Sequence, residues 1–145
     1  MKPVVHVAAS AAVSALLFGI TKSVSLTIVS FFTGFLIDID HVLDYIREYG
    51  LVPDVRKFFR VFYENRFKKV LVIFHGWEWI ALLFYVSWLT GWNDVVLGVG
   101  IGALHHLILD QMGNNATGAG YFFFYRALHG FILHAAVQVS DDKRT

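Results

Sequence analysis

Seven polar side chains that can ligate a metal ion lie within, or at the ends of, apolar segments of this 145-residue chain. They are His6, Asp38, Asp40, His41, His75, His106 and Asp110. Ionisable groups are costly inside a membrane segment, and those found there usually face a bundle interior, pair with one another and serve a function. Since the chain has no cysteine, a metal site would use nitrogen and oxygen donors. Imidazoles mixed with carboxylates suit Zn, Mn or Fe.

His106 and Asp110 are four residues apart in an apolar segment. On a helix this spacing places both side chains on one face, where they can bind one cation. An intrahelical hydrogen bond that satisfies two buried groups would need the same spacing, so the pair alone leaves both readings open. The neighbouring His105 points elsewhere and is expected to pack or to form a hydrogen bond.

A second cluster is the run Asp38–His41. On an ideal helix Asp38 and His41 share a face, whereas Asp40 lies with Asp44 on another, so both Asp38 and Asp40 reach one site only if the helix frays or breaks. Acidic residues at a helix C-terminus oppose the macrodipole, and a bound cation would offset that cost. We favour metal ligands here over a solvated, charged helix end.

A third cluster contains His75 and Glu78, which are three residues apart within another apolar segment. A glutamate there is costly unless it binds metal, accepts a proton or forms a pair. We therefore predict Glu78 as a catalytic base or a further ligand, the alternative being a structural pair with Arg126 or a histidine. His6 gains its weight as a ligand from lying at the same expected depth as the other donors.

The last apolar segment adds further polar residues. Arg126 is predicted to bind a substrate phosphate bidentately, the alternative being that it extends to the lipid headgroups. His129 and His134 are five residues apart and do not share a helix face. We expect these two histidines to pack or to orient other groups.

The composition places these clusters in an integral membrane protein. The chain is 57% hydrophobic and 16% charged, below the roughly 25% charged residues of soluble domains, and it is too small to bury so much apolar surface. Each of five apolar segments approaches the ~20 residues needed to span a bilayer. They are Pro3–Ile20, Ser23–Ile46, Val70–Leu89, Val95–Met112 and Tyr121–Val139. We expect an all-α membrane bundle of about five helices, forming a single domain over residues 1–145.

The segment Pro53–Lys69 interleaves basic and aromatic residues, which is typical of an interfacial amphipathic helix; a solvated basic loop is the alternative. The positive-inside rule places it in the cytoplasm. With the five segments alternating in direction, all seven donors then fall near the cytoplasmic face. We expect a prokaryotic-type inner or cytoplasmic membrane.

Seven donors exceed the four ligands of a mononuclear zinc site, so we expect one or two divalent ions. A two-metal site can activate water and stabilise the attacking and leaving oxygens in phosphoester hydrolysis. A site at headgroup depth, beside a basic aromatic helix, points to membrane lipid as a partner and to a lipid-like phosphorylated substrate. The net charge of +1 argues against a nucleic-acid binder.

The order of these motifs resembles that of the YdjM-type family of membrane-bound, metal-dependent hydrolases. The matching residues are His6, Asp38-Ile39-Asp40-His41, His75 and His106-Leu107-Ile108-Leu109-Asp110. The resemblance implies a helical membrane hydrolase with a divalent-metal centre. The types of side chain that bind the metal would be loosely similar to those of zinc-dependent phospholipase C. Two positions depart from the family pattern: Ile37 stands where a proline is usual, and Glu78 stands near the position of a second histidine.

Two other classes compete with the hydrolase. A divalent-metal or proton transporter could use the same buried ligands as a relay, and so small a chain would then need to form a homo-oligomer. The outer halves of the second, third and fourth segments, however, are almost purely apolar. A haem-binding electron carrier could use paired histidines, but the carboxylates at the site argue against it. We rank the hydrolase first, the transporter second and the haem carrier third.

Overall fold

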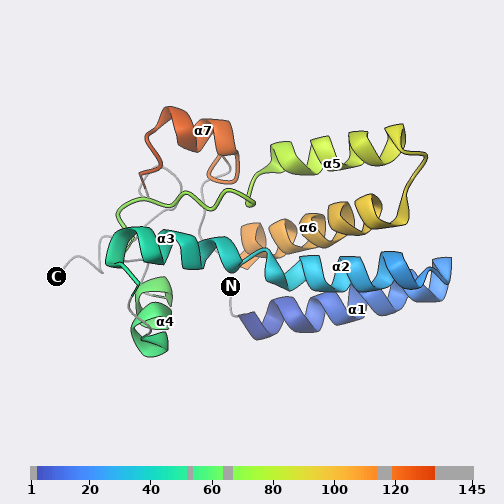
Figure 1. The fold of residues 1–145 in the computed structure, drawn as a ribbon, viewed down its shortest axis with the longest axis horizontal. Helices are drawn as coiled ribbons and strands as arrows, with labels where there is room; N and C mark the ends of the chain where they lie inside the picture. The colour runs from blue at the N-terminus through green and yellow to red at the C-terminus, as the bar shows by residue number, and fades with distance from the viewer. Residues whose placement is uncertain (1–2, 52–53, 64–66, 114–118, 133–145) are drawn as a thin grey trace. The chain divides into compact units, whose positions relative to one another are not determined.

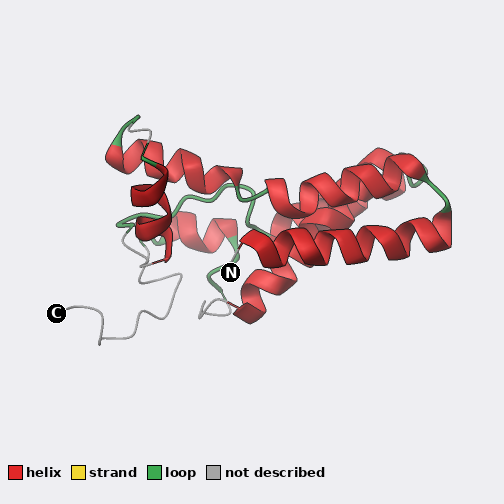
Figure 2. Ribbon diagram, turned by 90° about the horizontal axis from the view of Figure 1, so that it is seen from below, coloured by secondary structure: helices red, strands yellow, loops and turns green. Residues whose placement is uncertain are grey.

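The computed structural model describes residues 3–51, 54–63, 67–113 and 119–132. Its helices, drawn in Figure 1, are α1 (Pro3–Thr21), α2 (Val24–Leu36), α3 (Ile39–Tyr49), α4 (Val55–Tyr63), α5 (Trp77–Leu89), α6 (Asp94–Gly113) and α7 (Phe123–Leu128). Figure 2, coloured by secondary structure, shows only helices and loops in the described part of the chain. The predicted all-α class is therefore confirmed.

Within the predicted single domain, contacts divide the chain into two compact units. The first unit comprises Met1–Ile37 and Gly76–Asn114, and the second comprises Asp38–His75 and Asn115–Thr145. In the first unit, α2 packs against α1 and α6, and α5 packs against α6. In the second unit, α3 contacts α4.

Two tight turns connect the helices of the first unit. Between α1 and α2, Lys22 adopts a φ of 57°, and the Ser23 hydroxyl accepts a hydrogen bond from the Leu26 amide at 3.1 Å. That bond is an N-cap, which satisfies one of the amides left without an intrahelical partner at the start of α2. Between α5 and α6, Gly91 and Trp92 have φ values of 65° and 61° and reverse the chain.

Close packing of α2 and α6 depends on glycines. A Cβ atom at Gly102 would lie 2.7 Å from the Ser30 carbonyl oxygen, and one at Gly98 would lie 3.0 Å from that of Leu26. Small residues let backbones approach in this way when lipid supplies no hydrophobic force between helices. These glycines of α6 are buried inside the bundle.

The first unit buries polar side chains and exposes apolar ones. The buried residues of α1 are His6, Ser10 and Ser14, whereas Val4 and Ile20 are more than 70% exposed. This distribution is the reverse of that in a water-soluble bundle and suits a lipid environment. Three stretches are long and apolar enough to cross a membrane by length and composition: Pro3–Thr21, Val24–Tyr49 and Asp94–Gly113. Together these features indicate a membrane protein.

The third predicted segment is helical only in part. Helix α5 begins at Trp77 rather than Val70, and its 13 residues are fewer than the ~20 that a span requires. His75 therefore precedes this helix instead of lying five residues inside it. Gly76, with extended φ and ψ of −135° and 130°, marks the change from loop to helix.

The fifth predicted segment also differs from a continuous span. Helix α7 has six residues, and the chain turns after it at Gly130 and Phe131, whose φ values are 64° and 59°. The part of Tyr121–Val139 beyond residue 132, which includes His134, lies outside the described residues.

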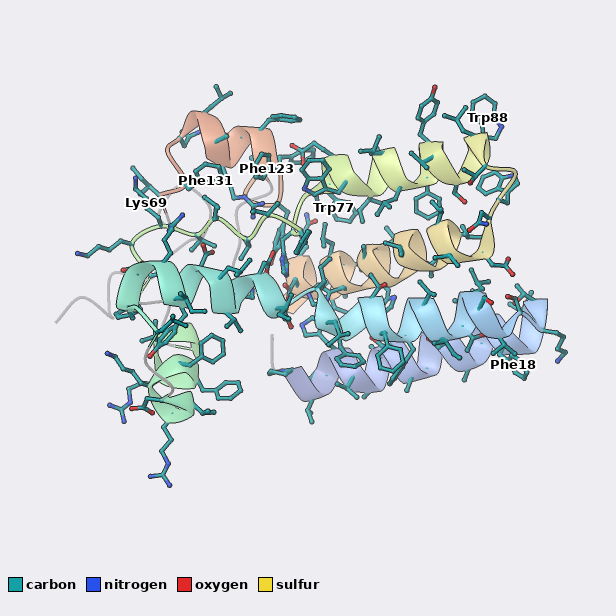
Figure 3. All side chains as sticks on the ribbon, viewed as in Figure 1. Phe18, Lys69, Trp77, Trp88, Phe123 and Phe131 are labelled. Atoms are coloured by element: carbon teal, nitrogen blue, oxygen red, sulfur yellow. The ribbon has the colours of Figure 1, made fainter. Side chains whose placement is uncertain are left out.

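The predicted amphipathic segment Pro53–Lys69 contains α4. The Asp54 carboxylate accepts a hydrogen bond from the Lys57 amide at 2.9 Å and so caps this helix. Val61 faces inward and forms a core with Tyr45 and Phe67, while the basic side chains of Arg56, Lys57 and Arg60 are exposed; Figure 3 draws the side chains on the ribbon.

Candidate metal centre

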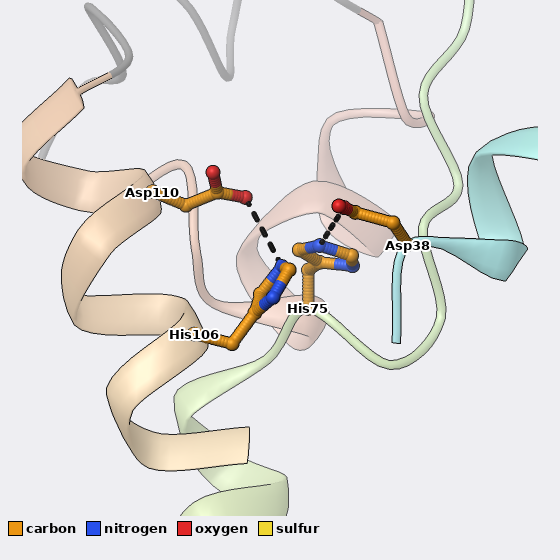
Figure 4. Close-up of side chains that lie close together, drawn as sticks. All are labelled: Asp38, His75, His106 and Asp110. Carbon is orange, nitrogen blue, oxygen red and sulfur yellow. Dashed lines mark ion pairs between the residues drawn. The ribbon is translucent and has the colours of Figure 1, made fainter. Parts of the chain in front are cut away.

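The first unit brings together three of the predicted donors, His6 of α1 with His106 and Asp110 of α6. The two imidazole rings stack with their centroids 4.1 Å apart. His6 Nε2 lies 3.1 Å from Asp110 Oδ1, and His106 Nε2 lies 3.5 Å from Asp110 Oδ2. All three side chains are buried. The spacing of His106 and Asp110 thus places them on one helix face as predicted, and Figure 4 shows their ion pair.

The backbone of α2 fixes the orientation of His106. Its Nδ1 lies 2.9 Å from the Gly34 carbonyl oxygen, which can only accept a hydrogen bond. Nδ1 therefore carries a proton, which makes Nε2, 3.5 Å from Asp110 Oδ2, the nitrogen that could bind a metal. Ligating histidines in metalloproteins commonly have this outer hydrogen bond.

His105 is held apart from this group. Its Nδ1 donates to the Ile101 carbonyl at 2.9 Å, and its Nε2 lies 3.0 Å from the Ser10 hydroxyl. Both contacts agree with the predicted hydrogen-bonding role. The ring packs so closely on Gly34 that a Cβ atom there would clash with His105 and with Ser10.

His6 has an unusual environment for a buried imidazole. It is 1% exposed, and within the described part of the chain neither of its ring nitrogens has a hydrogen-bond partner of acceptable geometry. A buried polar group left in this state costs about 1–3 kcal/mol. A cation coordinated by His6 would remove that cost, so the environment of this side chain fits a ligand role.

The second unit brings together the other four predicted donors, Asp38, Asp40, His41 and His75. Asp38 Oδ1 lies 3.4 Å from His75 Nε2 and 3.6 Å from His41 Nε2. The former pair is drawn in Figure 4. Donor atoms of Asp40, His41 and His75 all lie within 4.8 Å of one another. This His/Asp group could hold a metal ion, which agrees with the predicted metal cofactor.

A helix break makes this second group possible. Helix α2 ends at Leu36 and α3 begins at Ile39, so the chain leaves the regular helix at Ile37 and Asp38. Asp38 and Asp40 would lie on different faces of an unbroken helix, but here both approach His75. The two carboxylates lie at opposite nitrogens of this ring, Asp38 at Nε2 and Asp40 at Nδ1.

Asp40 orients His75. Its Oδ2 accepts hydrogen bonds from His75 Nδ1 and from the Phe74 amide, both at 3.0 Å. A carboxylate on Nδ1 leaves the Nε2 lone pair for a metal, as in the carboxylate–histidine pairs of zinc sites. Asp40 Oδ1 is buried with no hydrogen-bond partner among the described residues, so this oxygen is suited to bind a cation directly.

The loop that carries His75 is held by Asp44, which sequence reasoning did not assign to the site, and by Arg126, which was predicted to bind phosphate instead. Asp44 Oδ2 accepts hydrogen bonds from the amides of Leu71 at 2.8 Å and Val72 at 3.1 Å. Arg126 Nη2 donates to the carbonyl oxygens of Val72 at 3.0 Å and His75 at 2.8 Å. The position of Asp44, one turn after Asp40, was the available signal for its role.

The other predicted site residues lie as follows. Glu78 is in the first turn of α5 and is partly exposed, and its role as a base stays a prediction. Arg126 is 3% exposed within α7, and its role in binding phosphate also stays a prediction. His129 is exposed, and its Nδ1 donates to the Tyr125 carbonyl at 2.8 Å.

No family model, no curated protein and no solved structure matches this chain. The resemblance to the YdjM-type hydrolases therefore stays a prediction from the order of the motifs. The described residues define a helical protein with three candidate membrane spans and with buried His/Asp groups suited to a metal ion.

Proposed function

We propose that the protein is a membrane-bound, metal-dependent hydrolase that cleaves a phosphoester bond in a lipid or lipid-linked substrate. The observation that carries the proposal is the environment of His75. This buried imidazole has a carboxylate near each ring nitrogen, and His41 lies beside it with a ring-centroid distance of 5.1 Å.

The donor set favours zinc, with manganese or iron as alternatives, because it mixes imidazoles with carboxylates. One or two ions are proposed. A divalent ion held by these residues would supply Lewis-acid chemistry, polarising a phosphoryl oxygen and favouring ionisation of water.

The residues of the chain have separate proposed roles as ligands, as groups that orient ligands and as a base. Asp40 keeps the proton of His75 on Nδ1, and the Gly34 carbonyl does the same for His106. Asp38, His41 and His75 are the proposed ligands in the second unit, with Asp40 as a further donor, and the group of His6, His106 and Asp110 supplies those of the first. Glu78 is the proposed base, which would take a proton from the attacking water.

A lipid-like substrate is proposed because of helix α4, which belongs to the same unit as the second group of donors and contacts α3. Helix α4 exposes three basic side chains together with the apolar Val55 and Phe59. A helix of this kind binds at the level of phosphate headgroups, where anionic lipids gather. By the positive-inside rule this would be the cytoplasmic face.

A transporter is the second candidate, and one observation favours it. His6, Ser10 and Ser14 form a buried row along one face of α1, and Ser30 and Ser87 are buried in α2 and α5. Such hydroxyls could relay a proton or cation through the bundle. They are few and lack charge, so we rank this function below hydrolysis.

Release of the headgroup from phospholipids, or of phosphate from a lipid phosphomonoester, in detergent micelles tests the proposal. We would compare the wild type with His75→Ala and His129→Ala in the presence of zinc or manganese. His129 is a matched control, since it is an exposed histidine of the same unit that belongs to neither donor group. We expect release by the wild type and by His129→Ala, and at least a hundredfold loss in His75→Ala. No release from any lipid, with manganese uptake into proteoliposomes, would favour the transporter.

A further inference from the structure

Arg126 is a buried cation that donates hydrogen bonds to two backbone carbonyls. Its side chain is 3% exposed. A guanidinium cannot lose its charge in a protein, and burying a charge is costly unless it is paired or hydrogen-bonded. Its Nη2 donates to the Val72 and His75 carbonyl oxygens at 3.0 and 2.8 Å. Arg126 therefore contacts the backbone of the proposed ligand His75 itself.

The segment Leu71–His75 is held from two directions. The carboxylates of Asp40 and Asp44 accept hydrogen bonds from three of its amides, while Arg126 donates to two of its carbonyls. Within the segment, the His75 amide also donates to the Val72 carbonyl at 3.0 Å. The segment is thus a short turn with charged groups bound to both its donors and its acceptors.

This turn has a conformation that its own residues do not favour. Val72 has a φ of 30°, and a positive φ is rare for a β-branched residue. Such a conformation persists only where the surroundings impose it. The Val72 carbonyl accepts hydrogen bonds from both Arg126 and the His75 amide. These bonds help to hold Val72 in this conformation.

The structure also explains how Arg126 is itself kept in place. The Phe131 amide donates to the Arg126 carbonyl at 2.8 Å, and the Val70 amide donates to the Phe131 carbonyl at 2.9 Å. The turn after α7 is therefore bonded to the residue that begins the loop. Main-chain and side-chain bonds together connect Arg126 to both ends of Val70–His75.

We propose that Arg126 is a positioning residue that holds the Val72–His75 turn and so aims His75 at the metal. The assignment of a metal to His75 rests on the proposed function, whereas the effect on the turn does not. This role differs from phosphate binding, because it acts in the protein without substrate. Both hydrogen bonds come from Nη2, and lysine would keep the charge but lose the planar guanidinium that places this nitrogen between the two carbonyls.

The test compares Arg126→Lys and Arg126→Gln with Arg60→Lys, the same change at an exposed site on α4. Hydrogen exchange of the amides of residues 71–75 would be measured by mass spectrometry on the full-length protein in detergent. Zinc affinity would be measured by competition with a chelator. Loss of a hydrogen bond from a charged donor should speed exchange of these amides roughly tenfold. Loss of an outer-shell partner should weaken zinc binding about 10–100-fold.

Unchanged exchange and unchanged zinc affinity in Arg126→Lys would overturn the inference. A raised KM for a phospholipid with unchanged exchange would also overturn it, in favour of phosphate binding. If the wild type bound no zinc, that result would contradict the proposed function. Faster hydrogen exchange in the variant would still support the role of Arg126 in holding the turn. If Arg126→Gln lost protection from hydrogen exchange throughout both units, the variant would be unfolded. The result for the milder Arg126→Lys would then decide whether Arg126 holds the turn.

Discussion

Oδ2 of Asp40 lies 3.0 Å from Nδ1 of His75, and both side chains are 1% exposed. The same oxygen accepts the Phe74 amide, so it fixes the ring and the backbone next to it. A carboxylate in this position sets the tautomer of the imidazole and increases its basicity toward a metal. The pair is therefore best understood as one orienting group and one ligand.

Asp40→Asn should weaken metal binding while leaving the fold in place. The amide keeps the size of the side chain but loses the charge that holds the His75 proton on Nδ1. We expect zinc affinity to fall about 10–100-fold, measured by chelator competition. Asp54→Asn, an exposed change in the same unit, is the control. Equal affinity in both variants would contradict an orienting role for Asp40.

His6→Leu should have opposite effects on stability and on metal binding. Nδ1 of His6 has no hydrogen-bond partner among the described residues, and Nε2 meets Asp110 at 3.1 Å without hydrogen-bond geometry, so an apolar side chain removes a penalty of about 1–3 kcal/mol in the metal-free protein. We expect the unfolding midpoint in chelator to be unchanged or higher. Stabilisation by added zinc should be reduced, which thermal unfolding with and without metal would show. A large loss of stability in chelator would instead make His6 a structural residue.

Gly102→Ala should disrupt the packing of α2 and α6. The added Cβ would lie 2.7 Å from the Ser30 carbonyl oxygen, which cannot move without shifting the helix. Overpacking of this kind costs about 1–3 kcal/mol. Gly100→Ala is the matched control, since its nearest contact would be 3.6 Å away on Leu83. Thermal unfolding in detergent should separate the two variants, and equal midpoints would refute the close approach.

Local spacing predicted the parts of the site that lie on regular helices. His106 and Asp110 are four residues apart and meet on one face of α6. The run at Asp38 carried less information, because helix periodicity alone places Asp38 and Asp40 on different faces. The break at Ile37 and Asp38 brings both Asp38 and Asp40 to His75. The sequence could predict this contact only on the condition that the helix breaks there.

The loop before α5 could not be predicted from hydropathy. Val70–Phe74 is as apolar as a membrane helix, but its conformation depends on Asp44, 27 residues before Leu71, and on Arg126, 54 residues after Val72. Window-based reasoning does not include contacts at such separations. The short α7 has the same explanation, since the turn at Gly130 and Phe131 is bonded to Val70.

Elemental analysis of the purified protein tests the central claim most directly. The wild type and His129→Ala should contain one or two equivalents of zinc, manganese or iron per chain, and His75→Ala and His106→Ala should have lost part or all of it. Circular dichroism would confirm that every variant keeps its helices. Absence of metal from the wild type after reconstitution, or equal metal content in all four proteins, would contradict the account.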